Sequence, residues 1–294
     1  YYRNKPNSES TRLVLKEKMR SSLTCPLIAM EKPVGFLFFS HRNPNTYDKS
    51  HVQVFMRTAG HVSRIVEKAI LFESLEKEQA KSEKLLTSIL PSSVVSRLKE
   101  ESGYLADQIQ DATIVFADIV GFTDWAGECR PEHMVRQLSQ IFEVFDMIAR
   151  DFNVQKIGTH GDLYLAAGGL PASCDGHTEN VADFSLAILE AIGRFQGHEG
   201  QPMRLRIGIH SGPVVAGVTG KWAFRYDIWG STVNLASRLE STSEPGRIHV
   251  SEAVFKRLSE AYFLEPRGTV NLKGFGDMST YWRNKNQEPK SSAC

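Results

Sequence analysis

Hydrophobic and polar residues follow three successive patterns along the chain, and the first covers roughly Cys25 to Val66. Two short β-rich runs, PLIAM and VGFLFFSH, lie on either side of a turn at Glu31-Lys32-Pro33. A polar loop around Asn43-Pro44-Asn45 then leads into an apolar run with helical spacing. The order strand, turn, strand, loop and helix predicts part of a small sheet domain.

A helical stripe follows between Ile65 and about Leu90, a stretch without glycine or proline. Its positions recur at alternating spacings of three and four, which is the heptad pattern of a parallel two-stranded coiled coil. Gln79 and Ser82 interrupt the seam, which sets the register of such a coil at some cost in stability. A single exposed helix that packs on its own domain is the alternative. The stripe consists of Ile65, Ala69, Phe72, Leu75, Gln79, Ser82, Leu86 and Ile89.

Strands and long helices alternate in the third part, from Asp111 to about Arg283. The run ATIVFAD predicts a buried strand, a helix is predicted from Pro131 to Arg150, and paired strands surround Gly161. A second helix is expected from about Thr178 to Phe195, followed by further strands and one more helix. This alternation predicts an α/β or α+β layer structure. We expect the chain to divide into 1–64, 65–108, 109–284 and a polar tail at 285–294, with Pro91 ending the long helix and SSVVSRLKEES forming a short amphipathic element.

Composition narrows the class of protein. Hydrophobic residues make up 41% of the chain, enough for a buried core, and 35 basic against 34 acidic residues leave no field suited to nucleic acid. The longest apolar runs fall short of the roughly 20 residues that a membrane-spanning helix needs. A start at Tyr1 within a polar stretch suggests a piece of a longer protein. The cysteines lack metal-binding spacing and indicate reduced, cytoplasmic thiols: Cys25, Cys129, Cys174 and Cys294.

Two aspartates lie where apolar strands are expected to end. Asp118 follows the run from Thr113 to Ala117, where an ionised carboxylate is costly unless a cation compensates it. Gly121 permits a tight turn whose backbone N–H groups can hold phosphate oxygens. Asp162 follows a hairpin turn in VQKIGTHGDLYLAAGG. Alone, each aspartate is more often a turn or cap residue, but aspartates on neighbouring strands can hold two divalent ions.

Six segments in the third part together resemble the catalytic domain of class III nucleotide cyclases, in the family order: ADIVGFT, KIGTHGD, RIGIHSGPVVAG, FRYDIWGSTVNLASRLE, GRIHVSEAVFKRL and VNLKGFG. The piece LLTSILPSSVVSRLKEE resembles the coupling helix that precedes such domains. The first part resembles the closing half of a GAF domain, a small-ligand sensor; a sheet used only for dimer contacts is the alternative. The resemblance implies an α+β fold of the ferredoxin-like, palm type and a head-to-tail homodimer.

The resemblance also implies a metal and phosphate site. Asp118 and Asp162 match the metal-binding aspartates, and the backbone of Ile119 completes the site for two Mg²⁺ or Mn²⁺ ions. The turn residues Gly121, Phe122 and Thr123 would lie against the triphosphate, and Lys273 would bind its terminal phosphates. Lys221 or Arg225 offers a further phosphate contact.

On the other face of the nucleotide, Asn234 and Arg238 match the pair that orients the ribose and stabilises charge developing at the α-phosphate. They lie four residues apart, so a helix that begins near Ser231 places both on one face. Without the resemblance, Arg238 would be interpreted as a surface ion pair of little consequence. No side chain stands out as a dedicated base: we expect His160 to be a solvent-facing turn residue and His210 a packed strand-end residue.

The base-reading positions depart from the family pattern. Asp227 matches the acceptor that takes a hydrogen bond from the adenine amino group, whereas guanine presents a carbonyl there. The partner position, usually Lys in adenylyl and Glu in guanylyl enzymes, falls on Gly158, whose side chain offers no donor or acceptor. Lys156, two residues earlier, is a possible substitute on the same strand face. We therefore expect preference for ATP over GTP with relaxed discrimination.

The expected function is an adenylate cyclase that converts ATP into 3′,5′-cyclic AMP and pyrophosphate at an obligate homodimer interface, regulated by an upstream sensor through the coil. A guanylate cyclase is the alternative, distinguished by its nucleotide preference. A third reading is a catalytically weak, cyclase-like nucleotide-binding module. The presence of Asp118, Asp162, Asn234, Arg238 and Lys273 argues against that third reading.

Overall fold

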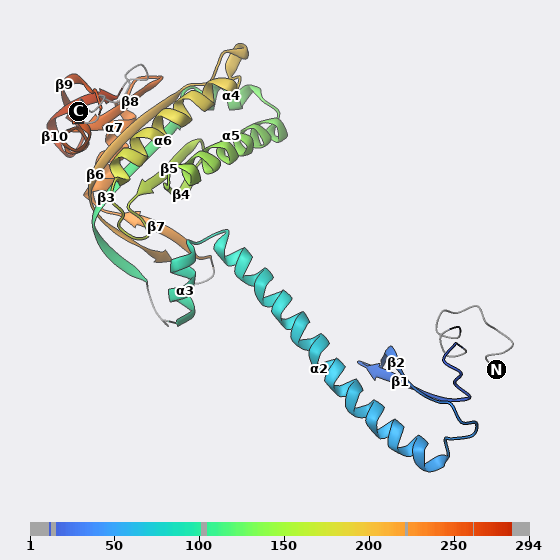
Figure 1. The fold of residues 1–294 in the computed structure, drawn as a ribbon. Helices are drawn as coiled ribbons and strands as arrows, with labels where there is room; N and C mark the ends of the chain where they lie inside the picture. The colour runs from blue at the N-terminus through green and yellow to red at the C-terminus, as the bar shows by residue number, and fades with distance from the viewer. Residues whose placement is uncertain (1–11, 13–15, 101–104, 221–222, 261, 284–294) are drawn as a thin grey trace, which may run out of the picture. The chain divides into compact units, whose positions relative to one another are not determined.

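The computed structural model describes residues 12, 16–100, 105–220, 223–260 and 262–283. Two compact units divide the chain, Tyr1–Leu85 and Leu86–Cys294, and Figure 1 draws both as a ribbon. The expected polar tail at 285–294 and the candidate phosphate ligand Lys221 lie outside the described residues. Each unit is described by itself below.

The N-terminal unit pairs an antiparallel hairpin with a long helix. Strands β1 (Ser21–Ala29) and β2 (Lys32–His41) form the hairpin, and helix α2 (Lys49–Thr87) follows it. The ring of Phe39 stacks on Phe55 of α2 at 3.8 Å between centroids. The backbone N–H of Ile28 donates to Ser63 Oγ at 3.0 Å. The expected order of strand, turn, strand, loop and helix is therefore present.

Helix α2 differs from the expectation in its length, because it begins at Lys49 rather than near the first heptad position. Only Ala59 and Ser63 of this helix are buried, and they lie on its hairpin-facing side. No other part of the described chain covers these residues of the heptad stripe: Ile65 is 69% exposed, Phe72 59% and Leu75 55%. Among the described residues, even this longest helix has no stretch apolar enough to cross a bilayer. The open stripe leaves apolar area available to a second helix.

The C-terminal unit is built on an eight-stranded sheet in the order β4-β5-β3-β6-β8-β10-β9, with β7 paired to one end of β6. Its first four strands have the ferredoxin-like order, and all pair antiparallel; β6 and β8 are parallel. The α+β class expected from the sequence is confirmed. The strands are β3 (Ala106–Ile119), β4 (Gln155–His160), β5 (Leu163–Gly168), β6 (Leu205–Thr219), β7 (Arg225–Trp229), β8 (Arg247–Ser251), β9 (Glu265–Leu272) and β10 (Gly276–Arg283).

Helices cover both faces of this sheet because alternate strand residues are apolar. Val115 and Ala117 of β3 point toward α5 and α6, whereas Ile114 and Phe116 join a second core that includes residues of α3 and β7. Figure 1 shows α5 and α6 lying side by side over the first face. The helices are α3 (Ser92–Glu100), α4 (Phe122–Glu128), α5 (Pro131–Asp151), α6 (His177–Ala191), α7 (Ser231–Ser241) and α8 (Glu252–Leu258), with short 3₁₀ turns at Ile192–Arg194 and His198–Gly200.

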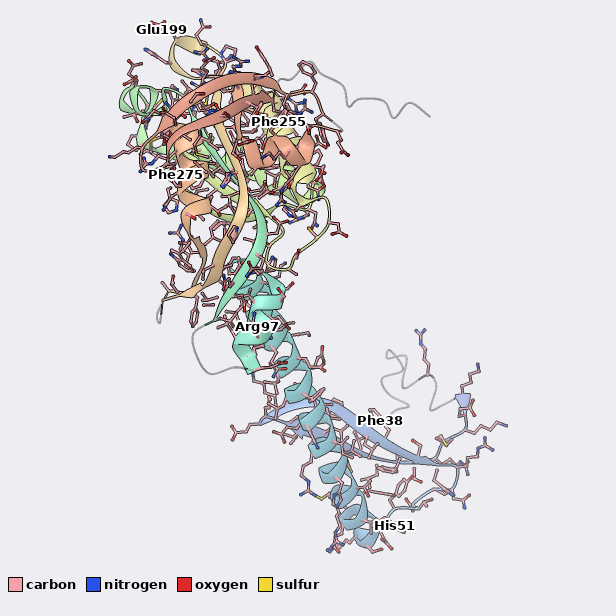
Figure 2. The ribbon with its side chains drawn as sticks, turned by 90° about the vertical axis from the view of Figure 1, so that its left-hand side faces the viewer. Phe38, His51, Arg97, Glu199, Phe255 and Phe275 are labelled. Carbon is pink, nitrogen blue, oxygen red and sulfur yellow. The ribbon has the colours of Figure 1, made fainter. Side chains whose placement is uncertain are left out.

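The short helix α3 attaches the end of α2 to the C-terminal unit. Val94 and Val95 are each 3% exposed and pack in the second core. Arg97 of α3, labelled in Figure 2, donates to both carboxylate oxygens of Asp107 on β3. A displacement of the preceding segment would therefore be passed to β3, the strand that ends at the candidate site.

Candidate functional site

Asp118 and Asp162 lie next to each other at one edge of the sheet. Asp118 is at the end of β3, opposite Leu163 of β5, and Asp162 is the residue just before Leu163. Burial and then the negative charge of Asp118 raise the pKa of Asp162 above its usual value. Both carboxylates are partly buried. The structure therefore places two acidic side chains from separate strands close enough to repel each other.

Arg206, which the sequence reasoning did not single out, supplies positive charge beside this pair. It lies on β6 opposite Asp118, and its guanidinium donates to Asp118 Oδ2 at 2.6 Å. Its Nε lies 3.2 Å from Oε1 of Glu240, an ion contact without hydrogen-bond alignment. Burial, followed by the charge of Asp118, raises the pKa of Glu240 to about 7. We call Asp118, Asp162, Arg206 and Glu240 the acidic half-site.

The turn after β3 has the geometry expected of a phosphate cradle. Gly121 adopts φ +71°, a left-handed conformation in which glycine is unstrained, and helix α4 begins at the next residue. A Cβ at Gly121 would meet nothing within 4 Å, so the backbone conformation rather than crowding favours glycine. Phe122 and Thr123 form the first turn of α4 and follow Asp118 by four and five residues.

The donor set fits divalent ions that prefer oxygen ligands. Two carboxylates and the Ile119 carbonyl are hard oxygen donors, and Mg²⁺ commonly takes its remaining ligands from water and substrate phosphates. No cluster of three or more His, Cys, Asp or Glu side chains suited to a metal occurs in the part of the chain that the structure describes. The mutual repulsion of Asp118 and Asp162 is the unfavourable term that bound cations would relieve.

Asn234 and Arg238 lie together on the exposed face of α7, as the spacing predicts. The helix approaches β6 closely because Gly208 has no side chain: a Cβ there would come within 2.1 Å of the Glu240 backbone nitrogen. Leu235 and Leu239 fix the other side of α7 through Leu272.

Lys273 directly follows Leu272 and is exposed. We call Asn234, Arg238 and Lys273 the basic half-site. Within the described ranges, no ion pair or side-chain hydrogen bond joins these three residues to the acidic half-site.

The expected base-reading positions come from two strands that contact each other without pairing. Gly158 is on β4 and Asp227 on β7, and Asp227 Oδ1 accepts a hydrogen bond from the Ile228 N–H at 2.9 Å. Its Oδ2 lies 3.5 Å from Nε of Arg225. Lys156 does not substitute for the side chain missing at Gly158, because its ammonium donates to Asp146 of α5 at 2.8 Å and lies over the Tyr164 ring.

The two candidate histidines differ in surroundings. His210 lies in the middle of β6 rather than at the expected strand end, because β6 continues to Thr219; it hydrogen-bonds Ser251 at 2.7 Å, whereas the neighbouring Ser211 bonds Thr113. Burial lowers the pKa of His210 to about 4, so it is neutral and packed at physiological pH. His160 is exposed, as expected of a turn residue, but it also contacts Arg225.

Two family models match the chain. Residues 105–285 match the adenylate and guanylate cyclase catalytic domain, and residues 3–67 match a GAF domain. An adenylate cyclase of Mycobacterium tuberculosis is 41% identical over 209 residues, 71% of this chain and 47% of that protein. Human retinal guanylyl cyclase 2 is 44% identical over 216 residues, 71% of this chain and 20% of that protein. The chain thus spans less than half the length of these curated relatives.

Solved structures show the same fold. The guanylate cyclase domain of RhGC from Catenaria anguillulae, solved with GTP, aligns with a TM-score of 0.59 at 35% identity, covering 60% of this chain and 98% of that one. A dimeric guanylyl cyclase domain from Blastocladiella emersonii aligns at 0.57 and 33%, covering 63% and 99%. With its catalytic-domain match spanning more than half of its length, this chain belongs to the adenylate and guanylate cyclase family and carries a GAF segment ahead of the catalytic domain.

Proposed function

We propose that this chain is an adenylate cyclase that converts ATP into 3′,5′-cyclic AMP and pyrophosphate. The observation that carries the choice of ATP is Asp227, whose partly buried side chain, as an ionised carboxylate, can only accept hydrogen bonds and cannot donate them. Adenine presents an amino donor at its 6-position, and guanine presents a carbonyl oxygen that a carboxylate repels. The identity to an adenylate cyclase of Mycobacterium tuberculosis supports the same assignment.

In the proposed reaction the ribose 3′-oxygen forms a bond to the α-phosphorus as the bond to the bridging oxygen of pyrophosphate breaks. Asp118 and Asp162 would hold two divalent ions, Mg²⁺ or Mn²⁺, which when bound would supply positive charge at the 3′-hydroxyl and at the pyrophosphate leaving group. Arg238 stabilises charge that develops on the α-phosphate oxygens, and Asn234 orients the ribose. The turn at Gly121 supports the triphosphate through its backbone N–H groups, and Lys273 contacts the terminal phosphates. The proton released from the 3′-hydroxyl passes to solvent.

The active form in this proposal is a head-to-tail homodimer. The acidic half-site of one chain faces the basic half-site and Asp227 of its partner, so each chain completes the other's site. Two features of the chain support this arrangement: no side-chain hydrogen bond or ion pair between described residues joins Asn234, Arg238 or Lys273 to the acidic half-site, and Arg238 and Lys273 are exposed.

Regulation would reach the site through α2. The apolar stripe on α2 is exposed and suited to a parallel coil with a second copy. A cavity of about 600 Å³ separates the segment Thr87–Pro91 from β4 and α5, and Gly158 and Tyr226 also line it. A rotation of the coil that moved this segment would therefore act on a space beside the base-reading strand.

A guanylate cyclase is the second candidate, favoured by the 44% identity to human retinal guanylyl cyclase 2. The experiment that separates the candidates compares ATP and GTP as substrates for the purified chain with Mn²⁺. We expect cyclic AMP to be the main product. Equal turnover of the two nucleotides, or preferred formation of cyclic GMP, would overturn the adenylate assignment.

The matched controls change one acidic side chain each. Asp118→Asn should lower cyclic nucleotide formation about a thousandfold, because the metal-holding pair loses one charge. Asp124→Asn, on the exposed first turn of α4, removes the same charge six residues away and should keep normal activity. Undiminished product from the Asp118 variant would contradict the two-aspartate mechanism whatever the nucleotide.

A further inference from the structure

The cavity of about 600 Å³ between the segment Thr87–Pro91, β4 and α5 is large enough for a small molecule. Sites for small molecules commonly have volumes of roughly 300–1,000 Å³. Its described lining residues all belong to the C-terminal unit. Among them, Gly158 is the only position assigned above to the cyclase site, and its side chain offers no group to a ligand. The cavity therefore has no function in the proposed reaction.

The inner wall of this cavity is apolar. Leu90, Ile157, Leu170 and Tyr226 line it, and all four are buried members of the second core. Tyr226 directly precedes Asp227 on β7, and successive side chains of a strand point to opposite faces. The cavity therefore lies on the opposite face of β7 from the carboxylate that we assign to adenine, and it is a separate site.

The outer wall carries an excess of positive charge. Its charged residues are Asp146, Arg150 and Lys156. The ammonium of Lys156 donates to Asp146 Oδ2 at 2.8 Å, so these two charges compensate each other. Arg150, in the last turn of α5, is exposed and has no ion pair or side-chain hydrogen bond with another residue of the described part of the chain. One guanidinium beside the apolar wall is thus available to an anion.

We propose that this cavity binds a small apolar molecule with one anionic group, whose apolar body covers Leu90 and Leu170 and whose anion pairs with Arg150. A nucleoside triphosphate does not suit it, because one available cation does not match a chain of three phosphates.

An occupant would also hold two parts of the chain at a fixed separation. The segment Thr87–Pro91 forms one side of the cavity, and β4, which carries Gly158, forms another. Binding would therefore favour one position of the segment that connects α2 to the catalytic unit and would change the rate of cyclic AMP formation. Only this effect on rate rests on the proposed adenylate cyclase function; the binding itself does not.

The binding test uses 8-anilinonaphthalene-1-sulfonate, an aromatic anion whose fluorescence rises in apolar surroundings, with the full chain at a concentration at which it is dimeric. We expect saturable binding that weakens about tenfold in Arg150→Ala, the loss of one charge-assisted contact. Arg150→Lys should recover part of the affinity, because it restores the charge. Arg136→Ala removes an exposed arginine elsewhere on α5 and should bind the dye as the unaltered chain does.

A second variant fills the cavity from its exposed side. Ser88 lines the cavity and is exposed, so Ser88→Trp should occupy the space with an indole ring and remove the saturable binding. Ser93→Trp, at an exposed position of α3 outside the lining, is the matched control and should leave it intact. Equal dye affinity in the unaltered chain, Arg150→Ala and Ser88→Trp would overturn the proposed site. Binding that disappears as dimers form would show that a second copy fills the cavity, and would also overturn it.

Steady-state kinetics test the effect on rate. Saturating dye should change kcat for cyclic AMP formation about fivefold in the unaltered chain and in Arg136→Ala, the lower end of usual coupling between two sites. It should have no effect on Ser88→Trp. A rise in KM for ATP with unchanged kcat would place the dye in the nucleotide site and contradict the inference. If the unaltered chain forms no cyclic AMP at all, the proposed function has failed, whereas the dye titrations still decide whether the cavity is a binding site.

Discussion

The acidic and basic half-sites differ in how the chain compensates their charges. In the acidic half-site, the charges of Asp118 and Glu240 are met by Arg206 from the adjacent strand, in partly buried surroundings. In the basic half-site, Arg238 and Lys273 are exposed; Arg238 is on a helix, and Lys273 follows a strand, whose apolar side chains Leu235, Leu239 and Leu272 pack together. A buried charge needs an opposite charge from the same chain beside it, whereas water stabilises an exposed cation until an anion binds.

This difference indicates which half-site depends on a second molecule. The acidic half-site holds three carboxylates around one guanidinium, and the register of β3 against β5 and β6 fixes the positions of Asp118 and Arg206. In the proposed dimer, the phosphates of a nucleotide on the partner's aspartates would face the exposed cations of the basic half-site. We therefore expect substitutions in the two half-sites to have different effects on activity.

The largest effect should come from two variants that each inactivate one half-site and leave the other intact. Asp118→Asn and Arg238→Ala should each lower activity about a thousandfold when assayed alone. Mixing the two purified variants and allowing subunits to exchange should restore about a quarter of normal activity, because half of the dimers are mixed and each contains one intact site. Cyclic AMP formation against mixing ratio provides the measurement. Activity that stayed at the single-variant level would show that each chain builds its site alone.

A second effect concerns the anchoring of α7. Nδ1 of His249, a fully buried residue, bonds the Leu239 carbonyl oxygen at 2.8 Å near the end of that helix, and burial lowers the His249 pKa from 6.5 to about 4. Because the unfolded chain binds a proton more readily, the stability from a neutral His249 is complete above pH 6.5 and is lost as the pH falls toward 4. The loss amounts to about 3 kcal/mol at most.

Urea unfolding of the full chain at several pH values would measure this dependence. His249→Gln should flatten the fall in stability between pH 6.5 and 4, leaving the part due to His210, whose pKa is also about 4. His198→Gln, at a half-exposed position, should leave the pH dependence as it is in the unaltered chain. An unchanged slope for the His249 variant would show that this ring does not remain neutral in the folded state.

A smaller effect, on dimer affinity, is expected from substitutions in α2, the helix that would bring the half-sites of two chains together. Replacing Gln79 and Ser82 by Leu should tighten dimerisation about tenfold, because two polar seam positions become apolar, and should alter cyclase activity by holding the coil in one register. Sedimentation equilibrium of the full chain measures the first effect. Glu78→Gln with Lys81→Gln, outside the stripe, is the control. Unchanged dimer affinity would favour a single exposed helix over a coiled coil.

Much of the fold followed from local pattern. Alternation of apolar residues in ATIVFAD predicted the central strand, and the stretch from Pro131 to Arg150 predicted a helix that the structure ends at Asp151. Asn234 and Arg238, four residues apart, needed only helical periodicity to share a face. The sequence predicted the helix after the loop at 43–45 and the heptad stripe from Ile65 as separate elements, and the structure joins them in the single helix Lys49–Thr87.

Contacts between side chains from different strands and helices could not be predicted from the sequence. Arg206 sits within an apolar strand as one charged residue among many, and only the register of β6 against β3 shows that it faces Asp118. Likewise, Lys156 seemed available for the purine by its position along β4, but Asp146 on α5 binds it. Arg225 reaches Gly158 only because β7 folds back beside β4.

The sequence alone determined the family motifs, the helix and strand types, and the pair of aspartates, because periodicity and short-range spacing act along one stretch of backbone. The tertiary structure decided which charges meet: the guanidinium of Arg206 with Asp118, the buried Glu240 behind it, and Arg225 over Gly158. Electrostatic interactions depend on distances between side chains from different strands, and those distances are set by register and packing that no single segment contains.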